Sequence, residues 1–486
     1  MTQISVLNKP IELIPDYAYS WRPYANEAMI YKQVQAPHGI VVFIIDPLTQ
    51  RWIITEEPVP TLLKLADGRR RFSEIIRIMT ANPEFDAPPN GFSGMAQELL
   101  EVGILFNCQT EHRASGLPVY NKCDPVGLHL EITNACNMTC THCYVASGKK
   151  LPGEMTIEEI YKTIDMLPPF SGKRIAISGG EPAVRKECGD ILEYCAVRCG
   201  HDIDLYSNGK NFPQKLAERI LDINRRAIAK IRIQISLEGA TSATSDLVRG
   251  QGSFDSTMKT LDMFKQLGLN RSVVLFVCLT KNNIGEIDDL IKLAEKQDVL
   301  MLVFSQWQKQ GNASDTAWAS IAPTLEEWVA VGEKLLNYYN PRLKVFGNFY
   351  GDIRNSGCGQ FGLDDALFPK HLYFYNAFPR ITPDGRIFAD QLWVDSNWIL
   401  GSIRENTLDE CFNSPKFYEQ LEQMRKRTEN IDECKACEWR SLCEGGSAGH
   451  TYAEYGHMNE KDLFCDARKY WFNRFVEHKI KQTFGG

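Results

Sequence analysis

The chain has 486 residues, too many for one ordinary domain, and its 44% hydrophobic and 24% charged residues are typical of a soluble globular protein. A net charge of −7 without a long Lys/Arg tract argues against a nucleic-acid partner, and the longest clean apolar run, Ile40 to Ile45, is too short to cross a membrane. The first residues lack a signal-peptide pattern, so we expect a cytoplasmic protein, in which 15 cysteines are more often metal ligands than disulfide partners.

Residues 25–115 predict a small domain in which a hairpin precedes three helices. Two strands are expected, GIVVFIID and RWIITEE, joined by the turn at 47–50. Helical patterns follow around 61–66, from Phe72 and from Phe92. This order is typical of a winged-helix-like unit.

Residues 125–335 alternate between strand and helix patterns. Such alternation predicts an α/β fold whose parallel sheet curves into a partial (β/α)6 barrel. Ligands of such folds bind at the C-terminal ends of the strands. The six candidate strands are 127–133, 174–178, 202–207, 231–239, 272–279 and 299–305.

Three cysteines, Cys136, Cys140 and Cys143, directly follow the first of these strands. A zinc ion would need a fourth ligand, and His142 would have to fold back to provide it. An iron–sulfur cluster is the better interpretation, because thiolates are its usual ligands. Three thiolates leave one iron of a [4Fe–4S] cube open, and an open metal position usually serves chemistry.

The spacing Cys-x3-Cys-x2-Cys resembles the radical S-adenosylmethionine (SAM) superfamily, and three further motifs strengthen the resemblance. SGGEP (178–182), YSNG (206–209) and ISLEG (235–239) follow the next three strands. The resemblance implies that the three cysteines hold a cluster that binds SAM, and that a 5′-deoxyadenosyl radical abstracts a hydrogen atom from the substrate. It also implies SAM contacts from Tyr144, Gly179, Gly180, Glu181, Ser207, Asn208, Ser236 and Arg249.

Within this resemblance the contacts have separate roles. Gly179 and Gly180 let the backbone approach the SAM amino group beside Glu181, because a Cβ would block that approach. Arg249 pairs with the SAM carboxylate, and Tyr144 lies near the adenine.

Residues 340–486 contain a second cysteine group. Cys434, Cys437, Cys443 and Cys465 provide four thiolates, enough for a closed site, with a structural zinc as the alternative. Beside a radical SAM barrel, the run resembles the SPASM extension, and this implies an auxiliary [4Fe–4S] cluster with full cysteine ligation.

A second auxiliary cluster of the SPASM type is doubtful here. The family commonly has CEGGC, whereas this chain reads CEGGS with Ser447 in the last place, and Asp390 stands where a cysteine follows a Pro-Asp-Gly turn. Cys358 matches the leading cysteine of that site. Either the cluster is lost, or Cys358 and Asp390 belong to an unusual mixed ligand set.

The remaining cysteines are expected to be structural. Cys188, Cys195 and Cys199 recur on one side of a helical pattern, which predicts a buried helix face, with a further metal site as the alternative. The others without convincing partners are Cys108, Cys123, Cys278 and Cys411.

The N-terminal unit resembles the PqqD-like recognition element of enzymes that modify ribosomally made peptides. In that family the leader of a precursor peptide adds as a strand to the sheet edge. The alternative is a DNA-binding winged helix, in which Arg69, Arg70 and Arg71 would contact phosphates.

Together these resemblances predict a radical SAM/SPASM maturase of a ribosomally synthesised precursor peptide. The expected outcome is a side-chain cross-link, carbon–carbon or thioether; epimerisation is less favoured because it needs no net oxidation. An external electron donor such as flavodoxin or ferredoxin is implied. The alternatives are a maturase of a folded protein, as in sulfatase maturation, and a non-catalytic iron–sulfur scaffold that binds the peptide.

Overall fold

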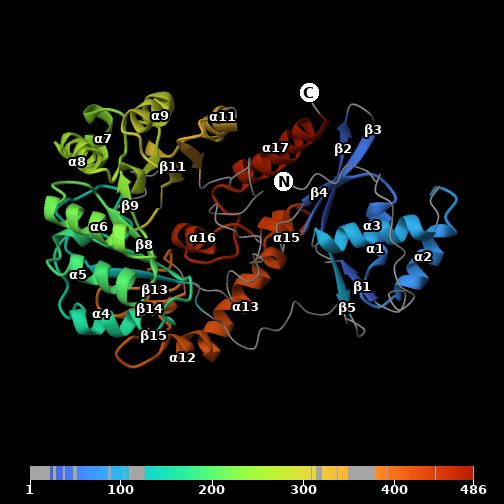
Figure 1. The fold of residues 1–486 in the computed structure, drawn as a ribbon, viewed down its shortest axis with the longest axis horizontal. Coiled ribbons are helices and arrows are strands. Elements are labelled where there is room, and N and C mark those ends of the chain that lie inside the picture. Colours follow the sequence, from blue (N-terminus) through green and yellow to red (C-terminus); the bar gives the residue numbers. More distant parts are fainter. Residues whose placement is uncertain are drawn as a thin grey trace.

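Figure 1 shows the computed structural model of the chain. The structure describes residues 22–484, except for a set of shorter ranges inside that span. The ranges left out of the description are 1–21, 26–28, 37–38, 47–51, 86–88, 103, 109–124, 126, 308, 314–319, 337, 348–377, 390, 444 and 485–486.

The N-terminal unit contains a three-stranded antiparallel sheet followed by three helices. Its strands, in the order β2-β3-β4, are Ile30–Ala36, Gly39–Ile45 and Trp52–Thr55. The helices are α1 (Val59–Leu65), α2 (Phe72–Thr80) and α3 (Pro89–Glu101), and a separate pair joins β1 (Arg22–Ala25) to β5 (Leu105–Cys108). The predicted hairpin and the three helices are confirmed, and β2 is an addition.

Helix α2 shows why this unit folds around its own core. Phe72, Ile75, Ile76 and Met79 are buried, and their spacing places them on one helical face. The Glu74 carboxylate accepts a hydrogen bond from the Arg71 backbone nitrogen at 2.8 Å and thereby caps the first turn.

The central part of the molecule is one ten-stranded sheet. Its order is β12-β11-β10-β9-β8-β7-β6-β13-β14-β15, and neighbouring strands from β12 to β13 run parallel. In chain order, the strands from the first part of this sheet are β6 (Gly127–Thr133), β7 (Arg174–Gly179), β8 (Asp202–Ser207), β9 (Ile231–Ser236), β10 (Val273–Leu279), β11 (Met301–Gln306) and β12 (Lys344–Gly347). All six predicted strands are present, and β12 adds a seventh.

Helices cover the outer face of this sheet, as Figure 1 shows in green and yellow. They are α4 (Ile157–Ile164), α5 (Cys188–Glu193), α6 (Gln214–Arg226), α7 (Ser242–Arg249), α8 (Ser253–Leu267), α9 (Ile287–Lys296) and α11 (Leu325–Leu336). Short helical turns lie at Pro182–Val184, Tyr194–Arg198, Asn270–Ser272, Ile284–Glu286 and Ser396–Trp398. Cys188, Cys195 and Cys199 are buried in the hydrophobic core beneath these helices, which confirms the predicted apolar helix face.

The C-terminal part continues the same sheet and then becomes helical. Strand β13 (Arg380–Ile381) pairs with β6, and β14 (Arg386–Phe388) and β15 (Gly401–Ser402) follow antiparallel. The helices are α12 (Leu408–Phe412), α13 (Pro415–Asn430), α14 (Asp432–Lys435), α15 (Arg440–Cys443), α16 (Ala448–Tyr455) and α17 (Cys465–Phe484).

A buried ion pair crosses the seam between β6 and β13. Arg380 Nε lies 2.7 Å from Glu131 Oε1, and Arg380 Nη2 lies 3.1 Å from Glu131 Oε2. Both side chains are almost fully buried, and the guanidinium also donates to the Trp393 carbonyl at 3.1 Å. The bidentate pairing links the C-terminal part to the first barrel strand.

The N-terminal sheet contacts the C-terminal helical part. The Lys32 ammonium on β2 lies 3.0 Å from a Glu438 carboxylate oxygen and 5.0 Å from the centre of the Trp439 ring. The Lys479 ammonium lies 5.4 Å from the centre of the Trp52 ring on β4. Both outer strands of the sheet therefore reach the last part of the chain.

His129, on β6, makes the stability of the protein depend on pH. Its ring is buried and has no hydrogen-bond partner among the residues that the structure describes, and burial lowers its pKa from 6.5 to about 4. The unfolded chain therefore binds more protons than the folded one between these pH values, and the free energy of unfolding falls as the pH falls through them. The slope contributed by this residue is about 1.4 kcal/mol per pH unit.

We predict that His129→Leu flattens this pH dependence, because it removes the buried group that must stay neutral. Urea unfolding at pH 7 and pH 5.5, followed by circular dichroism, measures it. His457→Leu, at an exposed position, is the control. Equal slopes in the parent and the His129→Leu protein would contradict the prediction.

None of the helices in the described ranges combines the length and the apolar character needed to cross a lipid bilayer.

Candidate functional site

The loop after β6 brings the first three cysteines to the C-terminal edge of the barrel. The loop is tied down on two sides. Thr141 N donates to the Val248 carbonyl at 3.0 Å, which joins the loop to the end of α7. Asn312 donates from its backbone to the Cys143 carbonyl at 2.9 Å and from its side chain to the Cys140 carbonyl at 3.0 Å.

The three thiols are neighbours, but they are spaced too widely to surround one ion. Among the described residues, the sole trio of ligand atoms within 4.8 Å of one another is that of His142, Glu238 and Cys278. Burial, with smaller contributions from Glu238, Cys136 and Cys143, raises the pKa of Cys140 to about 11 against the opposing effect of Arg249. The Cys140 thiolate therefore needs further positive charge nearby to stabilise it.

The SGGEP segment lies against the cysteine loop. Gly180 N donates to the Thr133 carbonyl at 2.7 Å, and Glu181 N donates to the Ala135 carbonyl at 2.9 Å. A Cβ on Gly179 would lie 2.1 Å from the Thr133 oxygen, and one on Gly180 would lie 2.3 Å from the Ala135 oxygen. The glycines are thus required by the close approach of two backbone segments, a reason that the sequence analysis did not give.

Glu181 is a buried carboxylate with three protein donors. It accepts from Asn208 N at 2.7 Å, from the Ser207 hydroxyl at 2.9 Å and from Ala183 N at 3.1 Å. Burial raises its pKa even though these hydrogen bonds favour the ionised form. Glu181 therefore fixes the end of β8 beside the end of β7.

Asn208 connects this strand end to the cysteine loop. Its side-chain amide donates to Asn137 Oδ1 at 2.8 Å and lies 3.7 Å from Cys136 Sγ. A hydrogen bond to the sulfur favours the thiolate. The structure thus brings together Cys136, Glu181, Ser207 and Asn208, all of which the sequence analysis selected.

Arg249 reaches the same edge from the last residue of α7. Its Nη1 lies 2.9 Å from Glu238 Oε1, and both side chains are nearly fully buried. Its Nε is buried without a partner among the described residues. This unsatisfied donor, beside Cys140, suits an anionic group of a ligand.

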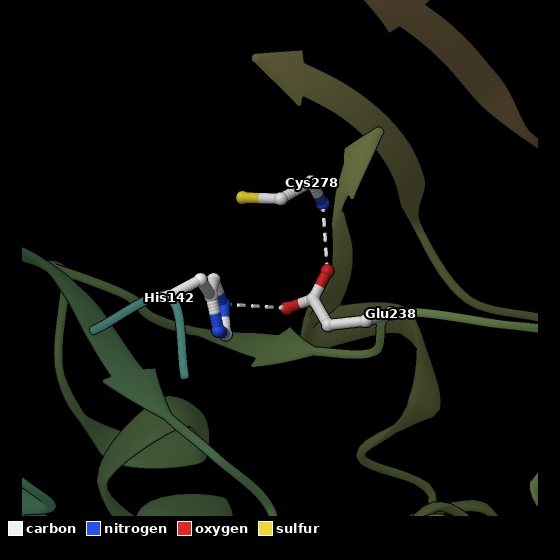
Figure 2. Close-up of side chains that lie close together, drawn as sticks. All are labelled: His142, Glu238 and Cys278. Atoms are coloured by element: carbon white, nitrogen blue, oxygen red, sulfur yellow. Dashed lines mark hydrogen bonds and ion pairs between the residues drawn. The ribbon is translucent and has the colours of Figure 1, made fainter. Parts of the chain in front are cut away.

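Glu238 is the centre of a small network (Figure 2). Its carboxylate lies 3.3 Å from His142 Nε2 and accepts from the Cys278 backbone nitrogen at 2.8 Å. The trio has the ligand types of a cation site, but the guanidinium of Arg249 already neutralises the carboxylate. We therefore interpret it as a hydrogen-bonded network.

Glu238 is the member of this network that was not selected from the sequence. Cys278, which is expected to be structural, is half-buried at the end of β10, and its thiol lies close to His142 and Glu238. His142 was weighed as a metal ligand alone, yet its ring packs at 5.4 Å, edge-on, against Trp307. The strand-end motif ISLEG contains Glu238 two residues after Ser236, and this place at a strand end was the available signal.

Two other predicted residues lie nearby without a defined ligand-facing role. Tyr144 is half-buried, and burial, together with the charge of Glu131, raises the pKa of its hydroxyl. Ser236 ends β9 and is half-buried.

The second cysteine group lines one enclosed cavity. Cys434 and Cys437 come from α14 and the turn after it, Cys443 ends α15, and Cys465 begins α17. All four are free thiols, and burial raises the pKa of Cys465 to about 11. Separate segments therefore bring the four predicted thiols to a single site.

The second auxiliary site, which is the third cluster site considered for this chain, lies only partly within the described residues. Cys358 and Asp390 lie outside the described residues. Ser447 is described, and it caps α16: its hydroxyl accepts from His450 N at 3.2 Å, while its own backbone nitrogen donates to Asp462 at 3.0 Å. This hydroxyl is already used as a helix cap.

Two known families match the chain. The profile of the Radical SAM superfamily matches residues 130–294, and that of the SPASM iron–sulfur cluster-binding domain matches residues 378–438.

Individual proteins are also similar to the chain. Mycofactocin maturase MftC of Mycobacterium tuberculosis is 30% identical over 66% of this chain and 78% of its own length. The AdoMet-dependent heme synthase of Methanosarcina barkeri is 24% identical over 69% of this chain and 94% of its own length. Streptococcus suis SuiB, in a crystal structure with its precursor peptide SuiA, aligns with 91% of this chain and 99% of its own at a TM-score of 0.55 and 15% identity. SuiB has also been solved bound to S-adenosylmethionine.

Proposed function

The chain belongs to the radical SAM superfamily and carries a SPASM domain, and from this we infer that it is a maturase of a ribosomally synthesised precursor peptide. It is an enzyme whose radical SAM domain binds SAM and a [4Fe–4S] cluster. When bound, these groups supply a radical that abstracts a hydrogen atom from the substrate. We propose a side-chain cross-link, carbon–carbon or thioether, as the outcome.

The residues at the barrel edge fit this pair of cofactors. We assign Cys136, Cys140 and Cys143 to the cluster, since their thiols are neighbours spaced too widely for one ion. The unpartnered Nε of Arg249 suits the SAM carboxylate. Further SAM contacts are proposed from the strand ends: Tyr144, Gly179, Gly180, Glu181, Ser207, Asn208 and Ser236.

The second cysteine group is proposed to hold one auxiliary [4Fe–4S] cluster. Cys434, Cys437, Cys443 and Cys465 line one cavity, and four thiolates complete the ligation of a cube. The domains are proposed as 25–115, 125–335 and 340–486. An external donor of the flavodoxin or ferredoxin class would supply electrons.

We predict eight iron atoms per fully loaded chain. The barrel site has three thiolates and the closed site four, whereas the third site offers Cys358, Asp390 and Ser447, of which one is a thiolate. Oxygen ligands are harder than an iron–sulfur core prefers, and the Ser447 hydroxyl already caps a helix. Anaerobic reconstitution followed by iron and sulfide analysis measures the count.

Mössbauer spectroscopy of the same samples checks that the iron is in cubane clusters. Ser447→Ala is the matched variant, and it should leave the iron count unchanged. Twelve irons in the parent protein, falling to eight in Ser447→Ala or Asp390→Ala, would contradict the prediction.

The N-terminal unit is proposed to be the PqqD-like element that binds the leader of the precursor. Strands β2 and β4 each pair only with β3 among the described residues, so an added strand has an edge to join. Arg69 and Arg71 are exposed, whereas the Arg70 guanidinium is paired with Asp67 at 2.7 Å. This pair leaves two of the three arginines for DNA phosphates, so the arginine run suits DNA less well. The alignment with SuiB over 91% of the chain supports a peptide substrate.

We predict that deleting residues 25–115 weakens precursor binding while SAM cleavage without substrate persists, because the cluster loop is tied to barrel elements. Fluorescence anisotropy of a labelled precursor and chromatography of 5′-deoxyadenosine measure the two. Salt-dependent binding of duplex DNA by the full chain, with no response to the precursor, would contradict the assignment.

Mass spectrometry of a co-expressed precursor tests the function as a whole. A cross-link removes two hydrogen atoms from the peptide, and fragment ions locate them. An unmodified peptide together with turnover of a porphyrin would favour the chemistry of the heme synthase relative. Modification of a folded protein would favour the alternative of a folded-protein maturase. Our choice of a precursor peptide over these two alternatives depends on the N-terminal unit. The sheet of this unit contacts the C-terminal part of the chain.

A further inference from the structure

The cavity of the second cysteine group has more basic than acidic side chains in its lining. Besides the four thiols it is lined by Arg440, Lys461, Arg468 and Lys469, and by a single carboxylate, Asp462. Two of the nearby cationic side chains are largely buried. They belong to Arg468 and, behind the lining, to Arg427.

Arg468 is aimed at one of the sulfurs. Its Nη1 lies 3.8 Å from Cys443 Sγ and 3.0 Å from Asp462 Oδ1. A Cβ on Gly446 would lie 2.3 Å from the same Nη1, so this glycine leaves the space that the guanidinium occupies. Its φ of +76° also favours glycine.

Arg427 is a buried cation that is satisfied by neutral groups alone in the described part of the chain. It is 1% exposed, and it donates to the carbonyls of Met458, Gly446 and Gly445 at 2.9–3.1 Å and to the Thr451 hydroxyl at 3.0 Å. Its charge interacts most favourably with Asp462, Cys434 and Cys443. Asp462 also pairs with Arg468, so two buried guanidinium groups share this one carboxylate. Buried charge that is incompletely balanced is costly, so the site suits an anion on its sulfur side.

A thiolate-ligated iron–sulfur cluster is such an anion, and one-electron reduction makes it more negative without moving a proton. Fixed positive charge and hydrogen bonds to the sulfurs stabilise the reduced form. The same cations would therefore make the cluster easier to reduce.

We propose that Arg427 and Arg468 raise the reduction potential of the auxiliary cluster and so adapt it to accept one electron. This inference rests on the proposed assignment of the cluster to Cys434, Cys437, Cys443 and Cys465. Asp462 acts in the opposite direction, since it partly neutralises Arg468.

Anaerobic redox titration followed by electron paramagnetic resonance tests the proposal. The full chain with Cys136, Cys140 and Cys143 replaced by alanine is the parent, so that the signal of the barrel cluster is removed. Arg468→Gln should lower the equilibrium constant for reduction at least tenfold, about 59 mV for a one-electron couple. Arg468→Lys keeps the charge and should restore most of the potential.

The matched control is Arg440→Gln. Arg440 lines the same cavity but is 39% exposed and lies 3.8 Å from Glu429, so solvent and its partner screen its charge and its loss should shift the potential less. Arg427→Gln is not used alone, because the side chain also holds the loop around Gly445.

Asp462→Asn provides a second test, in which the reduction potential should change in the opposite direction. This test remains valid even if the Arg468→Gln protein does not retain its iron. Removing the carboxylate should raise the potential, a result that a purely structural role would not produce. An unchanged or lowered potential in Asp462→Asn, or an unchanged one in iron-replete Arg468→Gln, would overturn the inference alone. A parent protein without any auxiliary signal would overturn the cluster assignment as well.

Discussion

Replacing Cys136, Cys140 and Cys143 together by alanine is expected to abolish formation of 5′-deoxyadenosine, while iron at the closed site remains. The reason is that no other described thiol at the barrel edge can take their place: Cys278 is directed to the Glu238 network. Chromatography of the reaction products and iron analysis of the purified protein measure the two effects.

The matched control removes three other thiols. Cys188, Cys195 and Cys199 are buried in the hydrophobic core, so their replacement by alanine should cost stability but leave 5′-deoxyadenosine formation in the folded fraction. SAM cleavage that survives in the first triple variant would show that the cluster is held elsewhere.

Arg380→Met is expected to destabilise the protein by about 3–5 kcal/mol. The substitution removes the guanidinium that pairs with Glu131 at 2.7 Å and leaves a carboxylate buried without its counter-charge. The free energy of unfolding, from urea titrations at neutral pH, measures the loss.

Two further proteins sharpen this measurement. Arg404→Met breaks the pair with Glu159, also at 2.7 Å but partly exposed, and should cost less than about 1 kcal/mol. The double variant Glu131→Leu/Arg380→Met should recover much of the loss, because neither charge remains. Equal destabilisation by Arg380→Met and Arg404→Met would refute the argument.

The strongly patterned elements could be predicted from the sequence. Strands β6 and β8 begin and end where their apolar patterns do, because buried parallel strands are bounded by polar turns. Strand β2 was missed because its buried ends enclose mostly half-exposed or polar positions. Strands β13 and β15 have two residues each, too few for any periodicity, and their existence depends on pairing across the chain.

The candidate site divides in the same way. Residues that follow strand ends, such as Cys136, Glu181 and Asn208, could be selected because parallel strands end at one edge. Residues that act on them from other elements could not: Arg427 on α13 and Arg468 on α17 meet the cysteine cavity only after the chain has folded. The role of Glu238 depends equally on where α7 places Arg249.

The ladder between β6 and β13 has a consequence for dissecting the enzyme. Without the C-terminal part, β6 would lose its partner on one side and become an unprotected edge strand, a template for intermolecular pairing. Glu131 would lose its arginine at the same time. The barrel is therefore not a free-standing module, and a fragment that ends before β13 should aggregate instead of serving as a minimal SAM-cleaving enzyme.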